Sequence, residues 1–503
     1  MKQDPSTVLA TGETPIPQSA TNLTPITVAM GDGIGPEIMQ ATLDILAAAK
    51  ARIAPETISI GQQMYASGHS AGIAPEAWDS LRRTKVFLKA PITTPSGGGY
   101  KSLNVTIRKS LGLYANVRPC TTYAPFVRSQ HPGMDVVIIR ENEEDLYAGI
   151  EHRQTADVYQ CLKLITRPGC ERIVRYAFEY ARAHGRRKVT CMVKDNIMKL
   201  TDGLFYEVFE EIAQDYPDLE TERYIIDIGA ARLATQPERF DVIVTTNLYG
   251  DIISDIAAEV SGSVGLAGSA NIGNQVAMFE AIHGSAPDIA GQDIANPSGL
   301  LLGAVQMLIH IGQADVAQRI HNAWLRTLED GQHTADMLSE HTQARLGTQA
   351  FAQAVVARLG QEPQVLPKVE YADQAPVQAA PAPAASVRRS RPNKALVGVD
   401  VFVDAPQVSP DSLGQRLSAV AGYGLSLQMI TNRGVKVWPG GMEETHCTDH
   451  WRCRFMAKPG HGIIYAQVLQ LLGELHAAGI DIIKTENLCE FDAVKGYSMG
   501  QGQ

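Results

Sequence analysis

Short runs of β-branched and apolar residues alternate with helix-length segments through most of the first 330 residues. Ile26 to Met30 and Val86 to Leu88 are typical of strands, whereas Pro36 to Lys50 places its apolar residues on one face of a helix. Strands separated by helices predict an α/β architecture with a mostly parallel or mixed sheet. The same alternation continues through the segments 135–140, 170–184, 188–193, 241–245, 298–311 and 314–329.

Length and charge exclude several classes of protein. The chain has 503 residues, of which 45% are apolar, enough for about three domains. Its net charge of −10 would repel nucleic acid, and no apolar run is long enough to cross a membrane, so we expect neither kind of partner. Seven dispersed cysteines without a C-x-x-C motif indicate a reducing compartment, and we expect a cytoplasmic protein.

Composition changes at both ends of the α/β region. Residues 1–23 are rich in Pro, Thr and Ser and are predicted to be disordered. Residues 366–393 are rich in Pro and Ala and predict an extended linker. Beyond the linker, strand and helix patterns follow in the order β-α-β-β-α-β with one extra strand, which predicts a separate α+β domain of ferredoxin-like type at 394–503.

Two motifs resemble known binding sites only partly. Gly31 to Glu37 follows a strand and precedes a helix, but its spacing is G-x-G-x-G, so an ordinary tight turn is favoured over a Rossmann dinucleotide site. His446, Cys447, His450 and Cys453 are all types of zinc ligand. Strand alternation places His450 and Cys453 on opposite faces, which argues against a zinc site.

Three arginines and two small polar residues suggest an anion site. Ser102, Asn104 and Arg108 share one short segment, and Arg118 and Arg140 end later strand-like segments. Guanidinium groups match carboxylates in bidentate geometry, so three of them would suit a substrate with two or three carboxylates. Solvated surface arginines are the alternative.

Two aspartates suggest a metal site. Asp251 and Asp255 follow a strongly apolar strand and lie four residues apart, on one face of the expected helix. Like charges so placed repel each other, and a hard cation such as Mg²⁺ or Mn²⁺ would relieve the repulsion. Asp251 could instead serve as a simple helix cap.

Six motifs in order between about residues 24 and 360 resemble those of the β-decarboxylating dehydrogenases, the family of isocitrate, isopropylmalate, homoisocitrate and tartrate dehydrogenases. They lie at 31–37, 114–119, 140–149, 194–199, 247–255 and 283–291. The resemblance implies the two-domain fold of that family, which is not a Rossmann fold. A large cofactor-binding domain would comprise 24–112 and 262–362, and a small domain with the dimer interface and clasp would comprise 113–261.

The resemblance also implies roles for individual residues. Arg108, Arg118 and Arg140 would bind substrate carboxylates, and the Ser-x-Asn-x-x-x-Arg pattern of Ser102 and Asn104 is similar to that of isocitrate dehydrogenases, where these two residues receive a third carboxylate. The implied metal ligands are Asp251 and Asp255 of one chain together with Asp227 of the other chain of a dimer. Tyr147 resembles the general acid that protonates the enolate, and Lys194, also reaching from the partner, would assist removal of the hydroxyl proton.

The coenzyme expectation depends on the loop 283–291, which in this family wraps the adenosine half. NADP enzymes of the family usually carry Lys-Tyr after the proline of this loop. Here Asp288 and Ile289 follow it, and an aspartate accepts a ribose hydroxyl and repels a 2′-phosphate, so we expect NAD. The implied contacts are Ile92, Thr94, Asn196, His283, Gly284, Ala286, Asp288, Ile289 and Asn296.

Taken together, the resemblance implies metal-dependent oxidative decarboxylation of isocitrate to 2-oxoglutarate with NAD, a step of the tricarboxylic acid cycle, by a homodimer or higher homo-oligomer. Homoisocitrate or tartrate oxidation is the alternative within the family, and a non-catalytic regulatory subunit is the alternative outside catalysis. The joint presence of Tyr147, Lys194, Asp251 and Asp255 argues against the regulatory subunit. The C-terminal domain resembles the extension of some bacterial isocitrate dehydrogenases, including the Thermus type.

Overall fold

The computed structural model of the chain describes residues 23–69, 71–94, 102–371, 391–420, 422–458 and 460–500. The predicted disordered segment 1–23 lies outside these residues except for Leu23, and so does the part of the predicted linker from 372 to 390. Within the described ranges, no helix is long and apolar enough to cross a membrane.

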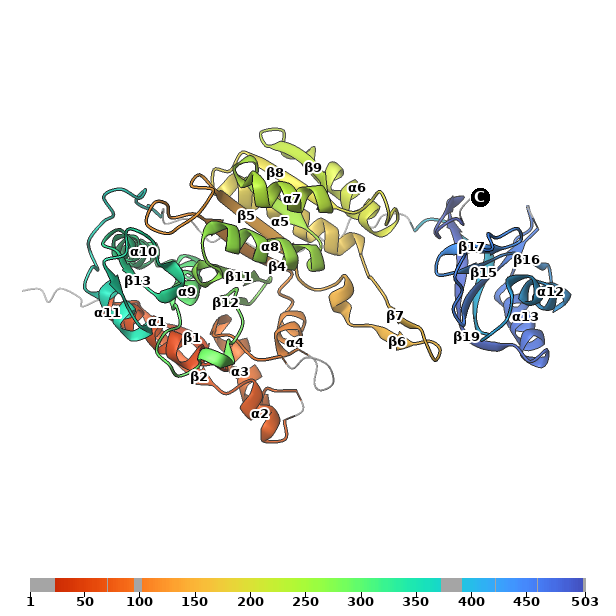
Figure 1. Ribbon diagram of the computed structural model, residues 1–503, viewed down its shortest axis with the longest axis horizontal. Coiled ribbons are helices and arrows are strands. Elements are labelled where there is room, and N and C mark those ends of the chain that lie inside the picture. Colours follow the sequence, from red (N-terminus) through yellow and green to blue (C-terminus); the bar gives the residue numbers. More distant parts are fainter. Residues whose placement is uncertain are drawn as a thin grey trace, which may run out of the picture.

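One mixed sheet of ten strands forms the centre of the α/β region, which confirms the predicted class (Figure 1). Its two halves join where β11 pairs antiparallel with β4. In spatial order the strands are β2 (Ile53–Ile58), β1 (Thr24–Ala29), β3 (Val86–Lys89), β12 (Ala277–Ala281), β11 (Gly268–Ile272), β4 (Ala115–Thr121), β5 (Asp135–Glu141), β10 (Val242–Thr245), β8 (Lys188–Val193) and β9 (Glu220–Ile225). The two halves share one continuous sheet, and the predicted domain boundaries stay a prediction.

Helices cover both faces of this sheet and enclose three apolar clusters. The largest cluster runs under α1 (Gly35–Ala48), α9 (Ser298–His310), α10 (Ala314–Glu329), α11 (Thr348–Val356), α5 (Arg167–Ala183) and α6 (Thr201–Ala213). A second lies under α3 (Pro75–Thr84) and α4 (Leu103–Ser110), and a third under α7 (Ile226–Thr235) and α8 (Asn247–Ser261). The shorter elements are α2 (Gln62–Ala66), β13 (Gln332–His333) and β14 (Ala344–Arg345).

The glycine turn between β1 and α1 is required by close backbone packing. Gly31 and Gly33 have φ angles of 72° and 60°, a region that favours glycine. A Cβ atom at Gly33 would lie 2.0 Å from the carbonyl oxygen of Ser285, and one at Gly31 would lie 2.3 Å from that of Pro91. The turn therefore brings two loops from β3 and β12 together, as expected of a tight turn and not of a dinucleotide fingerprint.

The segment after the linker forms a separate antiparallel sheet with its own core. Its strands are β15 (Lys394–Asp404), β16 (Leu425–Asn432), β17 (Val435–Trp438), β18 (His450–Ala457), β19 (Asp481–Phe491) and β20 (Val494–Lys495). The spatial order is β17-β16-β18-β15-β19-β20, and α12 (Pro410–Val420) and α13 (Tyr465–Ala477) pack on one face. This confirms a C-terminal α+β domain, although the ferredoxin-like description is not confirmed.

This C-terminal domain lies beside a hairpin that projects from the α/β region (Figure 1). The hairpin strands are β6 (Glu151–Arg153) and β7 (Tyr159–Cys161). At its tip, Thr155 donates a hydrogen bond of 2.6 Å to Asp449 of the C-terminal domain, and both residues are buried.

The C-terminal sheet buries an ion pair on the face away from its helices. Arg454 donates from Nε and Nη2 to the two oxygens of Asp400, each at 2.8 Å, and both side chains are at most 5% exposed. On the opposite face of β18, Cys453 is fully buried in the apolar core. Because Cys453 points away from His450, the zinc alternative is not supported; among the described residues, no cluster of three or more metal-ligand side chains occurs.

The Asp400–Arg454 pair generates a stability prediction. Asp400→Asn keeps the shape but leaves a buried guanidinium without a counter-charge, and we expect the free energy of unfolding of this domain to fall by about 3 kcal/mol. Denaturant unfolding followed by the fluorescence of Trp438 and Trp451 measures the change.

Glu486→Gln is the matched control, because Glu486 pairs with Lys484 at 3.0 Å on neighbouring β19 but is 57% exposed. Its effect should stay below about 1 kcal/mol. Equal effects of the two variants would contradict the assigned importance of the buried pair.

Candidate active site

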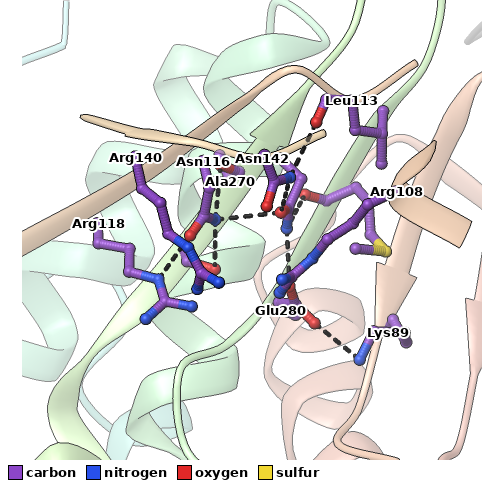
Figure 2. Close-up of polar contacts among 12 residues, drawn as sticks. Lys89, Arg108, Leu113, Asn116, Arg118, Arg140, Asn142, Ala270 and Glu280 are labelled. Carbon is purple, nitrogen blue, oxygen red and sulfur yellow. Dashed lines mark hydrogen bonds and ion pairs between the residues drawn. The ribbon is translucent and has the colours of Figure 1, made fainter. Parts of the chain in front are cut away.

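The structure brings the three predicted arginines together at the junction of the two sheet halves (Figure 2). Arg118 comes from β4, Arg140 from β5 and Arg108 from α4, and their side chains are 5%, 0% and 10% exposed. Burial raises the cost of keeping these groups charged and lowers the pKa of Arg118 and that of Arg140, the latter to about 10. The solvated alternative is therefore wrong for all three.

A buried carboxylate holds Arg108 and a lysine that the sequence did not single out. Glu280 in β12 accepts Arg108 Nη2 at 2.9 Å on one oxygen and lies 2.7 Å from Lys89 Nζ on the other. Burial alone would raise the pKa of Glu280, but Lys89 and Arg108 together hold it well below its usual range. Figure 2 shows both cations converging on this carboxylate.

Buried amides connect Glu280 to Arg118. Asn271 donates to Glu280 at 2.7 Å and accepts from Asn116 at 3.1 Å and Asn142 at 3.0 Å. Asn116 in turn accepts Arg118 Nε at 2.5 Å. Because these amides are buried and hydrogen-bonded to one another, Arg108 and Arg118 are held relative to each other before any substrate binds.

Asp251 is the meeting point of the two other arginines and Tyr147. It accepts Arg140 Nη1 on one oxygen and the Tyr147 hydroxyl, at 2.5 Å, on the other, while Arg118 Nη1 lies 3.3 Å away. Burial opposes ionisation, yet Arg140 and Arg118 keep the pKa of Asp251 below its ordinary value. Helix α8 begins at Asn247, so Asp251 lies in its second turn and is not a cap.

The hydroxyl of Tyr147 is set up to retain its proton. Tyr147 lies in a short 3-10 turn, Leu146–Ala148, with the Arg140 guanidinium 4.9 Å from its ring centroid. Burial and the hydrogen bond to Asp251 both raise the pKa of Tyr147. A protonated phenol at neutral pH is what a general acid requires.

The other predicted metal and proton-transfer residues form two separate groups. Asp255 is 68% exposed, with Arg118 Nη1 at 3.8 Å. Asp227 pairs with Lys194 Nζ at 2.5 Å, which lowers the pKa of Asp227. In the described part of one chain, Asp227 does not join Asp251 and Asp255 in a cluster able to hold a metal.

The two small polar residues border the arginines. Ser102 precedes α4 and lies 3.3 Å, oxygen to oxygen, from Thr94. Asn104 has a buried Oδ1 that accepts no hydrogen bond in the described chain. An unpaired buried acceptor of this kind is costly, so it indicates a place for a donor from a ligand or from water.

The predicted coenzyme residues are spread along three loops, which follow β3, β8 and β12. Ile92 is buried, Thr94 and Asn196 are exposed, and Ala286 has a φ of 36° at the start of the turn Pro287–Ile289. His283 has a buried Nε2 without a hydrogen bond, and burial lowers its pKa. Asn296 already donates to Asp336 at 2.9 Å and accepts from the backbone of Ser298 at 2.9 Å, while Gly284 and Asp288 are exposed and Ile289 is half-buried.

Sequence reasoning missed the residues that hold the arginines in place. Lys89 and Glu280 each stand in an otherwise apolar strand, and Asn247 accepts from Arg140 Nε and Nη2 at 3.1 and 2.7 Å. A single charged residue inside a buried strand pattern was the available sign, since such a residue must find a partner of opposite charge.

Comparison with known proteins identifies the family. Residues 25–355 match the isocitrate/isopropylmalate dehydrogenase model, and residues 394–503 match that of the C-terminal domain of bacterial isocitrate dehydrogenase. The chain belongs to the isocitrate/isopropylmalate dehydrogenase family and carries the bacterial C-terminal domain.

Relatives cover nearly the whole chain. A Rickettsia bellii protein named isocitrate dehydrogenase [NADP] is 56% identical over 95% of this chain and 99% of its own length. A Thermus thermophilus protein of the same name is 45% identical over 95% of this chain and 96% of its own length. A crystal structure of a Thermus thermophilus protein superimposes with a TM-score of 0.89 at 43% identity, covering 95% of this chain and 96% of that one.

These relatives contradict the expected NAD dependence, and with it NAD as the cofactor, because both are named for NADP. The expectation relied on Asp288 repelling a 2′-phosphate. In the structure Asp288 is exposed on a three-residue turn, where solvent screens its charge and the side chain can turn away. One exposed carboxylate is therefore too weak a criterion for the coenzyme.

The shared carboxylate generates a prediction on pH. Glu280→Gln removes the counter-charge of two buried cations, and we expect the free energy of unfolding at pH 7 to fall by about 3–5 kcal/mol. Because the folded pKa of Glu280 is depressed, its stabilisation is complete above the pKa of an unfolded glutamate, about 4.3, and is lost as the pH falls below it. Denaturant titrations between pH 7 and pH 3 measure the difference.

Glu222→Gln serves as the control, since Glu222 is 26% exposed and pairs with Lys188 at the edge of the sheet. The difference in the free energy of unfolding between wild type and Glu280→Gln should become smaller below about pH 4. A difference that does not change with pH would contradict the charged state assigned to Glu280.

Proposed function

We propose that this protein catalyses the metal-dependent oxidative decarboxylation of isocitrate to 2-oxoglutarate and carbon dioxide with NADP, in the tricarboxylic acid cycle. The single observation that carries the proposal is the convergence of three buried guanidinium groups beside the carboxylate pair of α8. The coenzyme is supported by the names of relatives that match nearly the full chain.

Isocitrate fits this site by charge and by number of contacts. Arg118 and Arg140 have ordered guanidinium groups close to Asp251, and Arg108 adds a third, with a buried Nε that has no hydrogen bond. Ser102 at the start of α4 and Asn104 within it supply a hydroxyl and an amide N–H that can donate to a further carboxylate. Three cations with two neutral polar groups suit a tricarboxylate better than a dicarboxylate of similar size.

The carboxylates of α8 fit a divalent cation. Asp251 and Asp255 lie on one helix face, and oxygen-only ligands are those that Mg²⁺ and Mn²⁺ prefer. Asp255 is largely exposed, and Arg118 Nη1 lies 3.8 Å from it, beyond hydrogen-bond distance, so a further positive charge would be favourable there. When bound, a divalent cation supplies Lewis-acid stabilisation of negative charge on the substrate's oxygens.

Within this proposal the chain's own residues bind, orient and move protons. The guanidinium groups hold the carboxylates of isocitrate and so fix its reacting carbon. Lys194 would assist removal of the proton from the hydroxyl group of isocitrate, and a bound NADP would supply the acceptor for the hydride. After carbon dioxide departs, the Tyr147 hydroxyl donates its proton to the enolate carbon, and its raised pKa keeps that proton available.

We further propose a cytoplasmic homodimer in which Lys194 and Asp227 act on the partner's site. The proposal is supported by their pairing with each other, apart from Asp251 and Asp255.

We also propose a division into three domains, which comprise residues 24–112 with 262–362, 113–261 and 394–503, and a ferredoxin-like fold for the last of them. The latter is supported by the βαββαβ order and the β16-β18-β15-β19 arrangement.

Initial rates test the proposed function. Isocitrate with NADP should be turned over at least about a hundredfold more efficiently than homoisocitrate, isopropylmalate or tartrate with either coenzyme, because only a tricarboxylate of this length engages all three arginines. Chelation should abolish turnover, and Mg²⁺ or Mn²⁺ should restore it. Efficient turnover of another substrate, or activity that survives chelation, would overturn the proposal.

A second prediction separates the two chemical steps. Tyr147→Phe removes the proposed acid but leaves the arginines in place, so conversion of added oxalosuccinate to 2-oxoglutarate should fall about a hundredfold or more. Reduction of oxalosuccinate by NADPH should fall far less. Tyr180→Phe, which changes another half-buried tyrosine, on α5, is the control. Equal losses in the two assays of Tyr147→Phe would exclude the acid role.

A further inference from the structure

Lys163 lies between β7 and α5, where its ammonium group connects two buried carboxylates. Its Nζ donates to Asp202 Oδ1 at 2.6 Å and lies 3.6 Å from Asp145 Oδ1. The Lys163 side chain is 12% exposed, and those of Asp145 and Asp202 are 1% and 0% exposed. Lys163 Nζ lies over the ring of Tyr249, 4.7 Å from the ring centroid. None of these residues has a role in the function proposed above.

The Asp202 branch leads to Lys194. Asp202 stands in the first turn of α6, and its second oxygen accepts the backbone N–H of Lys194 at 2.7 Å. Lys194 is the first residue after β8, so this hydrogen bond fixes the point at which its side chain leaves the sheet. The pairing of Lys194 with Asp227 starts from that point.

The Asp145 branch leads to Tyr147 and α8. Asp145 has φ 65° and ψ −149°, a backbone region in which residues other than glycine are strained. Its Oδ2 accepts the backbone N–H of Leu248, in the first turn of α8, at 2.9 Å. Tyr147 follows two residues later and donates to Asp251 of the same helix. The strained conformation is thus held by the side chain that also anchors the helix.

We propose that Lys163 is a positioning residue that fixes the Tyr147 and Lys194 segments together. Two buried carboxylates this close to one ammonium group repel each other without it, and each would then turn away from the backbone N–H that it holds. The inference rests on the proposed function, because it assumes the roles of Tyr147 and Lys194. In the proposed dimer, Lys194 of each chain acts in the partner's active site. The ammonium group of Lys163 would then position Tyr147 in one active site and Lys194 in the other.

Oxalosuccinate, presented directly to the full-length protein, distinguishes the two branches. Its reduction by NADPH depends on the Lys194 segment, and its conversion to 2-oxoglutarate depends on Tyr147. Asp145→Asn should lower the rate of conversion to 2-oxoglutarate about fivefold more than the rate of reduction. Asp202→Asn should lower the rate of reduction about fivefold more than the rate of conversion. Lys163→Met should lower both about tenfold or more while the KM for isocitrate changes less than about threefold, since no arginine of the site is altered.

Lys188→Met is the matched control. Lys188 begins β8 and forms a half-buried ion pair with Glu222 at 3.2 Å, with 18% of its side chain exposed, and both oxalosuccinate rates should stay near those of wild type. Thermal unfolding of every variant reports the folded fraction. If these residues had only a structural role, each variant would lower the reduction and the conversion of oxalosuccinate by the same factor. That result in Asp145→Asn and Asp202→Asn would overturn the proposal, even if Lys163→Met failed to fold. Wild-type kcat in Lys163→Met would also overturn it.

Tyr147→Phe and Lys194→Met in the same two assays separate this inference from the proposed function. If these variants show step-specific losses and the aspartate variants do not, only the positioning role is wrong. If neither shows a step-specific loss, the assigned chemistry fails, and the positioning role fails with it.

Discussion

Positive charge buried between the two halves of the sheet is the constraint on which the rest of this structure depends. Arg118, Arg140, Arg108 and Lys89 are each at most 10% exposed, and charges so far from water persist only beside carboxylates or hydrogen-bond acceptors. Glu280 and Asp251 supply those carboxylates, and a chain of buried amides runs from Glu280 to Arg118. The strands that carry these groups must therefore meet in one register, which the β11–β4 pairing provides.

This constraint also explains why the site is ordered in the chain itself. Each guanidinium group is held by at least one neighbour, so a substrate carboxylate meets donors that are already oriented and need no costly rearrangement. Asp251 lies between Arg140 and Tyr147 and links the anion site to the proposed acid. In the proposed reaction, this one carboxylate would couple substrate binding, metal binding and proton transfer.

Much of the fold could be predicted because its causes are local. Continuous apolar runs located strands such as β5 and β10, which are buried on both faces. A helical period of apolar residues located helices such as α5 and α10, each of which buries one face. Edge strand β2 contains Pro55 and is half-exposed, so it lacks that pattern and was not predicted. The motifs located the arginines and Asp251, but the partners Glu280 and Lys89 could not be assigned, because ion pairing over 191 residues of chain depends on the fold. The coenzyme expectation was wrong because exposure of Asp288 could not be judged from neighbouring residues.

The carboxylate shared by Lys89 and Arg108 restricts how this protein can evolve. Loss of Glu280 leaves two buried cations without their counter-charge, and loss of either cation leaves Glu280 with one partner fewer. Any single change therefore lowers stability, even where a double change would be neutral. The three positions are epistatic: an ancestral lineage could leave this arrangement only through a less stable intermediate. Gene lineages that share the fold should therefore keep all three residues or exchange them as a set.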